Sequence, residues 1–345
     1  MGDIVNSGVE GRMTRTKEYS SLNGMKAFAA IGIMLMHIRA NGNYYIDGYL
    51  YNTVILSLTD FVFLFMTISA FGLCCGYFEK MVLKNVDILG FYSRRIQKIF
   101  PFFALMVLID ILMSPSKDAI KEAFADLTLM FGFLPNPGSI SVIGVGWFIG
   151  LIFVFYLCFP FFCFLLVSKQ RAWTAFAVSI LWNIIGSSYF SLARSNILYS
   201  GCFFLAGGLI YLYRKEIERV PEIIWIVLTA GAIGLYYIMD RNSMAALLLA
   251  ALLLAVGITD NSRLLNNRVV GFLSSISLEI YICHMAVFRV MEKLHLTRLF
   301  GDGWKSYTIT AILVLTGASI FALAAQKGLK WMESVWKRKA QAERN

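Results

Sequence analysis

One basic residue and one histidine lie on a single apolar stretch near the start of the chain, at a spacing that could serve chemistry. Lys26 and His37 are eleven positions apart in the sequence. On a helix, at roughly 100° and ~1.5 Å per residue, their side chains would share a face about 16 Å apart, around half of a bilayer core. Ionisable groups at membrane depth are costly, so each is a functional candidate. Alternatively, Lys26 extends to the membrane interface and His37 is a hydrogen-bonded residue of a helix bundle.

A second cluster of cations lies at the start of a later apolar stretch. Arg94 and Arg95 precede Lys98 by four and three positions, so on a helix they form one basic patch. Pro101 follows and would be tolerated near a first helical turn. An ordinary cytoplasmic anchor explains Arg94, but it explains Lys98 less well, since Lys98 already lies within the apolar register. Such cations suit phosphate, so with Lys26 they predict a site for a phosphorylated molecule.

Coenzyme A matches this arrangement of charges. Its pantetheine arm is long and thin, of the same order as the separation of Lys26 and His37. Phosphates held by the cations would place a thioester deep in the membrane near His37. A histidine base at that position could take a proton from a hydroxyl that arrives from the opposite side.

The elements that must position these residues are membrane helices. The chain has 345 residues, of which 58% are hydrophobic and 15% charged, a composition typical of a polytopic helical membrane protein. Long apolar runs, in place of alternating ones, exclude a barrel. A moderately apolar stretch at 119–134 predicts a further interfacial or re-entrant helix. The sequence therefore predicts an all-α transmembrane bundle of about ten spans, at roughly 22–40, 54–77, 96–113, 146–167, 172–189, 196–213, 222–239, 243–259, 271–292 and 306–330.

The distribution of positive charge predicts the topology. If the loops alternate from a cytoplasmic N-terminus, 20 of the 31 lysines and arginines lie inside, 8 lie outside and 3 lie within spans. This bias fits the positive-inside rule and places both termini in the cytoplasm. The net charge of +10 is then a topology signal, and without a nucleic-acid motif it does not indicate nucleic acid. We expect a cytoplasmic N-terminal tail at 1–20, a membrane domain at 21–331 and a basic cytoplasmic C-terminal tail at 332–345, which forms a juxtamembrane helix.

The six cysteines indicate neither disulfides nor a metal site. All lie in apolar spans, and none has a zinc-ligand spacing. Cys283 adjoins His284, but a thiolate deep in lipid is disfavoured. We therefore expect no metal and no cysteine nucleophile.

Several stretches, in order along the chain, resemble the acyltransferase-3 family of integral membrane O-acyltransferases. Each motif is weak alone, but together they cover nearly the whole chain. The matching stretches are Leu22–Lys26 with His37, Asp60–Phe71, Arg95 with Lys98 and Pro101, Gly146–Phe148 with Tyr156 and Pro160, and Ile276–His284.

The resemblance implies roles for four residues. His37 would be the catalytic residue, and Lys26, Arg95 and Lys98 would contact acyl-CoA; we add Arg94 from the same patch. The chain departs from the family pattern with Asn23 for Asp, Ala70 for Gly and Lys98 for the second Arg. Lysine keeps the charge but loses the bidentate fork of arginine, which affects donor binding more than chemistry.

Other polar and aromatic residues are candidates with two interpretations each. They line the acyl path or support the site, or they form hydrogen bonds between helices that fix packing. For Trp147 the alternative is an aromatic belt at the membrane surface. The tyrosines at 44, 45, 49 and 51 also have two interpretations, as part of such a belt or as a sugar-binding surface. The candidates are Ser69, Trp147, Ser277, Glu279, Tyr281 and His284.

The sequence thus predicts a membrane O-acyltransferase. It would move an acyl group, most simply acetyl, from cytosolic acyl-CoA to a hydroxyl of an extracytoplasmic or membrane-linked acceptor, such as a cell-surface glycan. His37 would act as a general base or carry the acyl group. Acetyl-CoA would be a co-substrate, and no permanently bound cofactor is expected. We expect a multi-pass protein of the plasma membrane, in contact with membrane lipids, and the sequence does not indicate its oligomeric state. The alternative is a transporter or flippase for an anionic solute.

Overall fold

The computed structural model describes residues 19–139, 143–260 and 262–342. These residues form helices joined by turns and loops and contain no β-strand, so the all-α prediction is confirmed for the described part of the chain. Most of the predicted N-terminal tail, residues 1–18, lies outside it.

The longer helices are α1 (Ser20–Gly42), α2 (Phe61–Leu73), α4 (Ile88–Met113), α5 (Lys117–Leu127), α6 (Trp147–Leu166), α7 (Lys169–Ser188), α8 (Ile197–Leu212), α10 (Glu222–Ile238), α11 (Ser243–Thr259), α12 (Arg268–Ser275), α13 (Ser277–Lys293) and α14 (Trp304–Ala342). The short elements are η1 (Leu50–Ile55), η2 (Leu58–Asp60), η3 (Cys74–Phe78), α3 (Glu79–Val82), η4 (Met130–Phe133), η5 (Pro137–Ser139), α9 (Arg214–Ile217) and η6 (Leu296–Arg298).

Five of the described helical segments are long and apolar enough to cross a membrane. They are α1, the continuous segment Leu50–Val82, α4, α6 and the first part of α14, up to Val335. The pair α12 and α13, bent by 70° at its break, would make a sixth. Three further predicted windows coincide with the shorter apolar helices α8, α10 and α11, while the window at 172–189 falls on α7, which does not meet the same criterion. The protein is therefore a helical membrane protein with five or six such spans, and the count of ten stays a prediction.

Side-chain caps set where several helices begin. The Asp87 carboxylate accepts a hydrogen bond of 2.8 Å from the Gly90 amide and so starts α4 at Ile88. The sequence prediction began this span at 96, because charged residues interrupt the apolar run before that point. Pro101 consequently lies inside α4, and its predicted place in a first turn is wrong.

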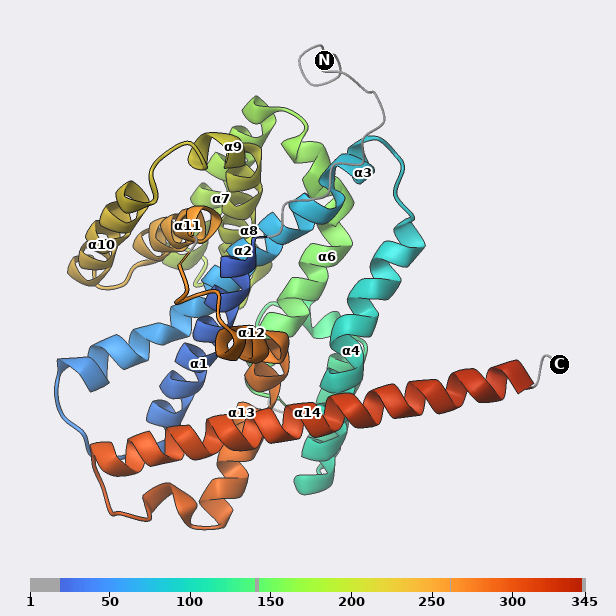
Figure 1. The fold of residues 1–345 in the computed structure, drawn as a ribbon, viewed down its shortest axis with the longest axis vertical. Helices are drawn as coiled ribbons and strands as arrows, with labels where there is room; N and C mark the ends of the chain where they lie inside the picture. Colours follow the sequence, from blue (N-terminus) through green and yellow to red (C-terminus); the bar gives the residue numbers. More distant parts are fainter. Residues whose placement is uncertain (1–18, 140–142, 261, 343–345) are drawn as a thin grey trace.

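Helix α1 lies within the bundle, packed against α2, α11, α12, α13 and α14 (Figure 1). Glycine permits two of these close approaches. A Cβ atom on Gly24 would lie 2.5 Å from the Leu265 carbonyl oxygen, and one on Gly32 would lie 2.6 Å from the Phe61 ring. These contacts fix the helix that carries both Lys26 and His37.

Helices lie at two places outside the main spans where the sequence predicts them, and their position relative to the membrane stays a prediction. Helix α14 continues past Trp331 to Ala342, as the predicted juxtamembrane helix requires, and crosses the bundle as one long rod (Figure 1). The stretch at 119–134 contains α5 and the short η4. The break between α12 and α13, at Ile276, brings a serine-rich turn to the side of α1.

Candidate active site

A cavity of about 870 Å³ opens between α1, α2, α4, α6, α12 and α13. Its walls carry six of the predicted residues, which the fold thus brings together from four helices: Lys26, Ser69, Lys98, Ser277, Glu279 and Tyr281. Apolar side chains, among them Phe65, Phe148 and Ile152, line the remainder. The space therefore combines a charged part with an apolar part.

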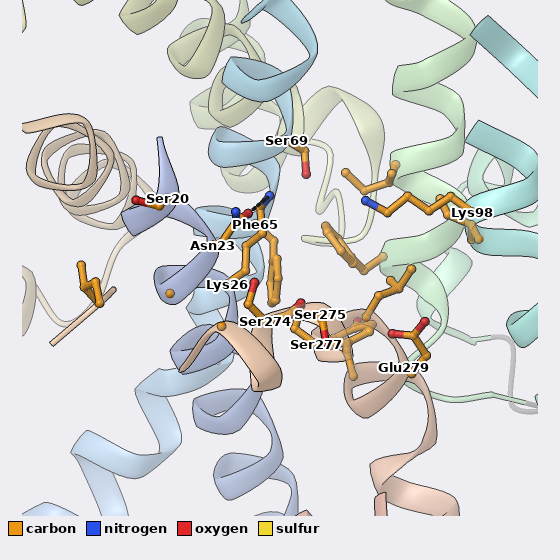
Figure 2. Close-up of a pocket in the computed structure, with 18 of the residues that line it drawn as sticks. Ser20, Asn23, Lys26, Phe65, Ser69, Lys98, Ser274, Ser275, Ser277 and Glu279 are labelled. Carbon is orange, nitrogen blue, oxygen red and sulfur yellow. Dashed lines mark hydrogen bonds between the residues drawn. The ribbon is translucent and has the colours of Figure 1, made fainter. Parts of the chain in front are cut away.

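The amino groups of Lys26 and Lys98 point toward one another across this cavity, with the Ser69 hydroxyl between them in the view (Figure 2). Lys26 forms one weak hydrogen bond, 3.5 Å to the Asn23 amide oxygen. Within residues 19–139, 143–260 and 262–342, neither lysine has a carboxylate within ion-pair distance. Two cations that face the same space, with no carboxylate in direct contact among the described residues, favour an anion between them.

The two arginines of the predicted patch lie beside this cavity and not on its wall. The Arg94 Nε donates to the Tyr77 hydroxyl at 3.2 Å. The Arg95 guanidinium lies 5.0 Å from the Tyr77 ring centroid and 5.8 Å from that of Tyr156. Tyr156 itself lines the cavity, so Arg95 contacts a residue of the cavity wall without lining the space.

His37 does not line the large cavity. It lines a second cavity of about 240 Å³, together with Asn41, Asp110 and Arg289. Because Lys26 lines the first cavity, the two ends of α1 present their functional side chains to different spaces. The predicted shared face of Lys26 and His37 thus does not place them in one continuous pocket in this structure.

An aromatic wall separates the two cavities. Tyr281 lines the large cavity, and its hydroxyl donates to the Val145 carbonyl oxygen at 2.6 Å. The rings of Phe148 and Phe65 pack against it at centroid distances of 5.5 and 6.2 Å. On the far side, His284 lies 6.2 Å from Tyr281 and 5.2 Å from His37, measured between ring centroids.

His284 is fully buried and has one unused hydrogen-bonding position. Its Nδ1 lies 3.1 Å from the Ile280 carbonyl oxygen. A carbonyl can only accept, so a neutral ring must carry its proton on Nδ1. The Nε2 atom is then an acceptor, and it has no hydrogen-bond partner among the described residues.

Other candidates fit a structural role. Glu279 lines the large cavity, and its carboxylate accepts a 2.7 Å hydrogen bond from Gln326 Nε2, as a packing network between helices requires. Trp147 lines neither cavity and lies with its ring centroid 5.9 Å from the Arg194 guanidinium. The Ser277 hydroxyl donates to the Ser274 carbonyl oxygen at 2.9 Å, across the break between α12 and α13.

The sequence analysis missed the polar residues around His37. The Asp110 carboxylate pairs with the Arg289 guanidinium at 3.1 Å, and both line the small cavity. Each lies within a predicted span, so the rule that marks intramembrane charges as functional could have found them. A further ion pair, Arg194 with Asp60 at 3.0 Å, was also missed, although Asp60 lies within the predicted span 54–77.

Two of the four tyrosines that follow α1 belong neither to a belt nor to a sugar-binding surface. Tyr44 and Tyr51 are buried and pack edge-on against Tyr307. Tyr45 and Tyr49 are exposed, and for them both interpretations stay open.

Comparison with known proteins agrees with the resemblance drawn from the motifs. The family model for the acyltransferase domain of the acyltransferase-3 family matches residues 19–325. No curated protein and no solved structure matches the chain significantly. The match includes both cavities, the aromatic wall and every predicted site residue. Because it covers most of the 345 residues, the chain belongs to the acyltransferase-3 family of membrane acyltransferases.

Proposed function

We propose that this protein transfers an acyl group, most simply acetyl, from acyl-CoA to a hydroxyl group of an acceptor on the other side of the membrane. The observation that carries the proposal is the arrangement of three residues on α1 and α4. Lys26 and Lys98 face one cavity, and His37 faces a second cavity beyond an aromatic wall. A donor and an acceptor could therefore approach the wall from opposite ends.

The large cavity suits the donor. Phosphates of CoA would lie between Lys26 and Lys98, where Arg268 on the same wall adds a third cation. The pantetheine arm would extend over Ile149 and Ile152 toward Tyr281. The positive-inside distribution supports a cytoplasmic opening for this cavity, with about ten spans and both termini in the cytoplasm of a plasma-membrane protein.

At the wall, His37 would act as the base. It removes the proton from the acceptor hydroxyl, and the oxygen forms a bond with the thioester carbonyl carbon. The carbon–sulfur bond then breaks, and the proton on His37 passes to the CoA thiolate. Because Tyr281 and Phe148 separate the cavities in this structure, their rings must turn to let the short acyl group through, which favours acetyl over long chains.

Two alternatives share the same residues. His37 could itself carry the acyl group between donor and acceptor, so that the group leaves CoA in one step and reaches the acceptor hydroxyl in a second. A transporter for an anionic solute would also use the cations of the large cavity. The polar cavity at His37 favours an enzyme, because a transporter of anions would not need a base beside a site for hydroxyl groups.

Incubation of the purified protein with radiolabelled acetyl-CoA in detergent would test the proposal. We expect slow release of acetate to water without an acceptor, and faster turnover with a hydroxyl acceptor. Mass spectrometry of surface glycans from cells with and without the protein should show a 42 Da difference, the mass of one added acetyl group. A protein that binds CoA but neither hydrolyses nor transfers the acetyl group would support the transporter.

A further inference from the structure

We infer that a third cavity, between α2, α8, α10 and α11, binds a single phosphate group. It has a volume of about 220 Å³ and shares no lining residue with the cavities at Lys26 and His37. Arg194 lines it from the loop before α8, and Arg241 lines it from the turn that joins α10 to α11. We call this space the arginine pocket.

Arg194 is fixed by contacts that leave one of its donors unused. Its Nη2 lies 3.0 Å from Oδ1 of Asp60 and donates to the Thr59 carbonyl oxygen at 3.1 Å. The guanidinium also lies 4.8 Å from the centroid of the Phe63 ring. Its Nε, however, is buried and has no hydrogen-bond partner among the described residues. A buried N–H group without an acceptor is costly, so a ligand oxygen at this position would be stabilising.

Arg241 has an unused donor as well and weaker charge compensation. Its Nε is also buried, and it has no partner within the described part of the chain. The guanidinium forms a long ion pair of 4.0 Å with the neighbouring Asp240, whose side chain is 97% exposed. Water screens an interaction with so exposed a carboxylate, so most of the positive charge of Arg241 remains available to a ligand.

The backbone of the α10–α11 turn holds Arg241 at the pocket. Asp240 and Arg241 both have left-handed conformations, with φ of 49° and 58°, which residues other than glycine adopt infrequently. The Arg241 amide donates to the Tyr236 carbonyl oxygen at 2.8 Å, which ties the turn to the end of α10. Unfavourable backbone conformations of this kind are often found at ligand sites.

The carboxylate in the pocket does not oppose an anion, because both of its oxygens are already bonded. Oδ1 of Asp60 pairs with Arg194, and Oδ2 accepts a 2.6 Å hydrogen bond from the Tyr236 hydroxyl. Arg194 thus cancels the charge of Asp60, and Arg241 leaves the pocket positive. The several oxygens of a tetrahedral phosphate can accept from two guanidinium groups at once. The volume lies below the 300–1,000 Å³ usual for whole ligands, so it suits one compact group.

The surroundings of the pocket favour a membrane lipid as the source of this phosphate. Helix α10 has exposed apolar side chains, among them Ile233, Leu235 and Ile238, as a surface in contact with lipid chains requires. The pocket lies at the turn where α10 ends, and basic pockets between membrane helices bind lipid headgroups. The positive-inside distribution predicts that this turn is extracytoplasmic. A free phosphate ion is the other source of the same chemistry.

The test uses the purified full-length protein in detergent without acyl-CoA, so its result does not depend on acyl transfer. Native mass spectrometry would measure the binding of dioleoyl phosphatidylglycerol, with dioleoylglycerol as the corresponding lipid without phosphate. Thermal unfolding in sodium phosphate and in sodium chloride of equal ionic strength would measure the effect of free phosphate. We expect the wild type to bind phosphatidylglycerol in preference to dioleoylglycerol.

Substitutions at Arg241 should then change this binding. Arg241→Gln should weaken it about tenfold or more, because a charged donor to phosphate is lost. Arg241→Lys keeps the charge but loses the fork of donors, so it should bind more weakly than wild type and more tightly than Arg241→Gln. Lys117→Gln also removes one positive charge, at an exposed residue that does not line the pocket, and should bind as the wild type does.

The two sources of phosphate give different results. Preference for phosphatidylglycerol that depends on Arg241 supports the inference with a lipid as the source. Stabilisation by sodium phosphate that Arg241→Gln abolishes, without a preference between the lipids, supports it with free phosphate as the source.

Three results would overturn the inference. One is wild-type protein that neither prefers phosphatidylglycerol nor gains stability in phosphate over chloride. A second is binding that Arg241→Gln leaves unchanged. The third is an equal loss of binding in Arg241→Gln and Lys117→Gln, since net charge alone would then explain it. Should Arg241→Gln not fold, Arg241→Lys carries the same comparison, and affinity equal to that of the wild type and of Lys117→Gln would contradict the role of the guanidinium.

Discussion

The imidazole of His284 lies beside that of His37, with ring centroids 5.2 Å apart and ring planes inclined by 41°. A hydrogen bond between two in-plane ring nitrogens places the centroids about 5 Å apart. The bond is not formed in this structure, yet His284 Nε2 is an acceptor that has no partner among the described residues. A modest rotation of His37 would let one of its nitrogens donate to His284 and leave the other free as a base.

His284 should therefore position His37. We expect His284→Phe to lower kcat at least tenfold while CoA affinity stays within threefold. His284→Gln keeps an acceptor near the position of Nε2 and should recover part of the loss. Steady-state transfer kinetics and calorimetric titration of CoA would measure both effects. Equal losses of kcat in the two variants would mean that His284 only fills space, because the hydrogen-bond acceptor that Gln keeps and Phe lacks would then have no effect.

His37 itself should be required for chemistry and not for donor binding. His37→Ala should reduce transfer to background, since the base is lost, and should leave CoA affinity largely intact, because His37 does not line the large cavity. Asp118→Asn, at an exposed position that lines neither cavity, is the control and should retain both transfer and CoA affinity. Near-native turnover in His37→Ala would show that His37 is structural and that the mechanism is wrong.

The two facing lysines should dominate donor affinity. Lys26→Ala or Lys98→Ala removes a cation from a partly desolvated phosphate contact and should cost about 1.5–3 kcal/mol, roughly ten- to a hundredfold in CoA affinity. Arg95→Ala should cost less, because Arg95 does not line the cavity. Calorimetric titration of CoA measures each change, and Lys84→Ala, outside the cavity, is the control.

Substitutions that keep or cancel charge sharpen this prediction. Lys98→Arg should bind CoA at least as well as the wild type, since guanidinium adds bidentate geometry. Asn23→Asp would place a carboxylate against the Lys26 amino group, which now contacts the Asn23 amide, and should weaken CoA binding. Unchanged affinity in both lysine-to-alanine variants would reduce the lysines to topology signals and favour the transporter.

Much of the donor site could be predicted from the sequence, because its residues lie at helical spacings or in family motifs. Lys98 and Lys26 were found in this way, and the structure places both on one cavity. The separation of His37 from that cavity could not be predicted. It depends on where Tyr281 and Phe148, which are far apart in the sequence, meet in the bundle. Helical spacing gives the direction of a side chain, but it does not show which other residues lie between two side chains of one helix.

The acceptor side was less predictable for a related reason. Asp110 and Arg289 are 179 positions apart, and each alone resembles a charge at a span end. Only the packing of α13 against α4 makes them a pair. The start of α4 was misplaced because the capping residue Asp87 lies well before the apolar run.

The predicted topology can be measured by labelling single introduced cysteines with a membrane-impermeant reagent. Tyr45 is exposed, at 78%, and follows the end of α1 near His37, so Tyr45→Cys should react in intact cells. Lys84→Cys, in the loop before α4, should react only after the membrane is opened. The positive-inside distribution motivates both expectations. Labelling of Lys84→Cys in intact cells would reverse the orientation and place the donor cavity on the wrong side for cytosolic acyl-CoA.

A buried carboxyl outside the membrane-spanning helices should make stability depend on pH. Asp126, on α5, is 1% exposed, and neither carboxylate oxygen has a hydrogen-bond partner in the described residues. Burial, together with the nearby carboxylates of Glu122 and Asp110, raises the pKa of Asp126 to about 7. A raised pKa means that the folded chain binds this proton more tightly than the unfolded chain, whose Asp pKa is about 4. The contribution to stability is therefore fully present below pH 4 and is lost as the pH rises to about 7.

Asp126→Asn should remove this dependence, because an amide stays neutral at every pH. We expect the variant to melt at a higher temperature than the wild type at pH 8, with a difference that shrinks steadily toward pH 5. Thermal unfolding of the full-length protein in one detergent across this range would measure it. Asp118→Asn, which changes an exposed carboxylate on the same helix, should show no such trend. A difference between Asp126→Asn and wild type that does not vary between pH 5 and pH 8 would mean that Asp126 does not change its protonation state in this range, which would contradict a pKa of about 7.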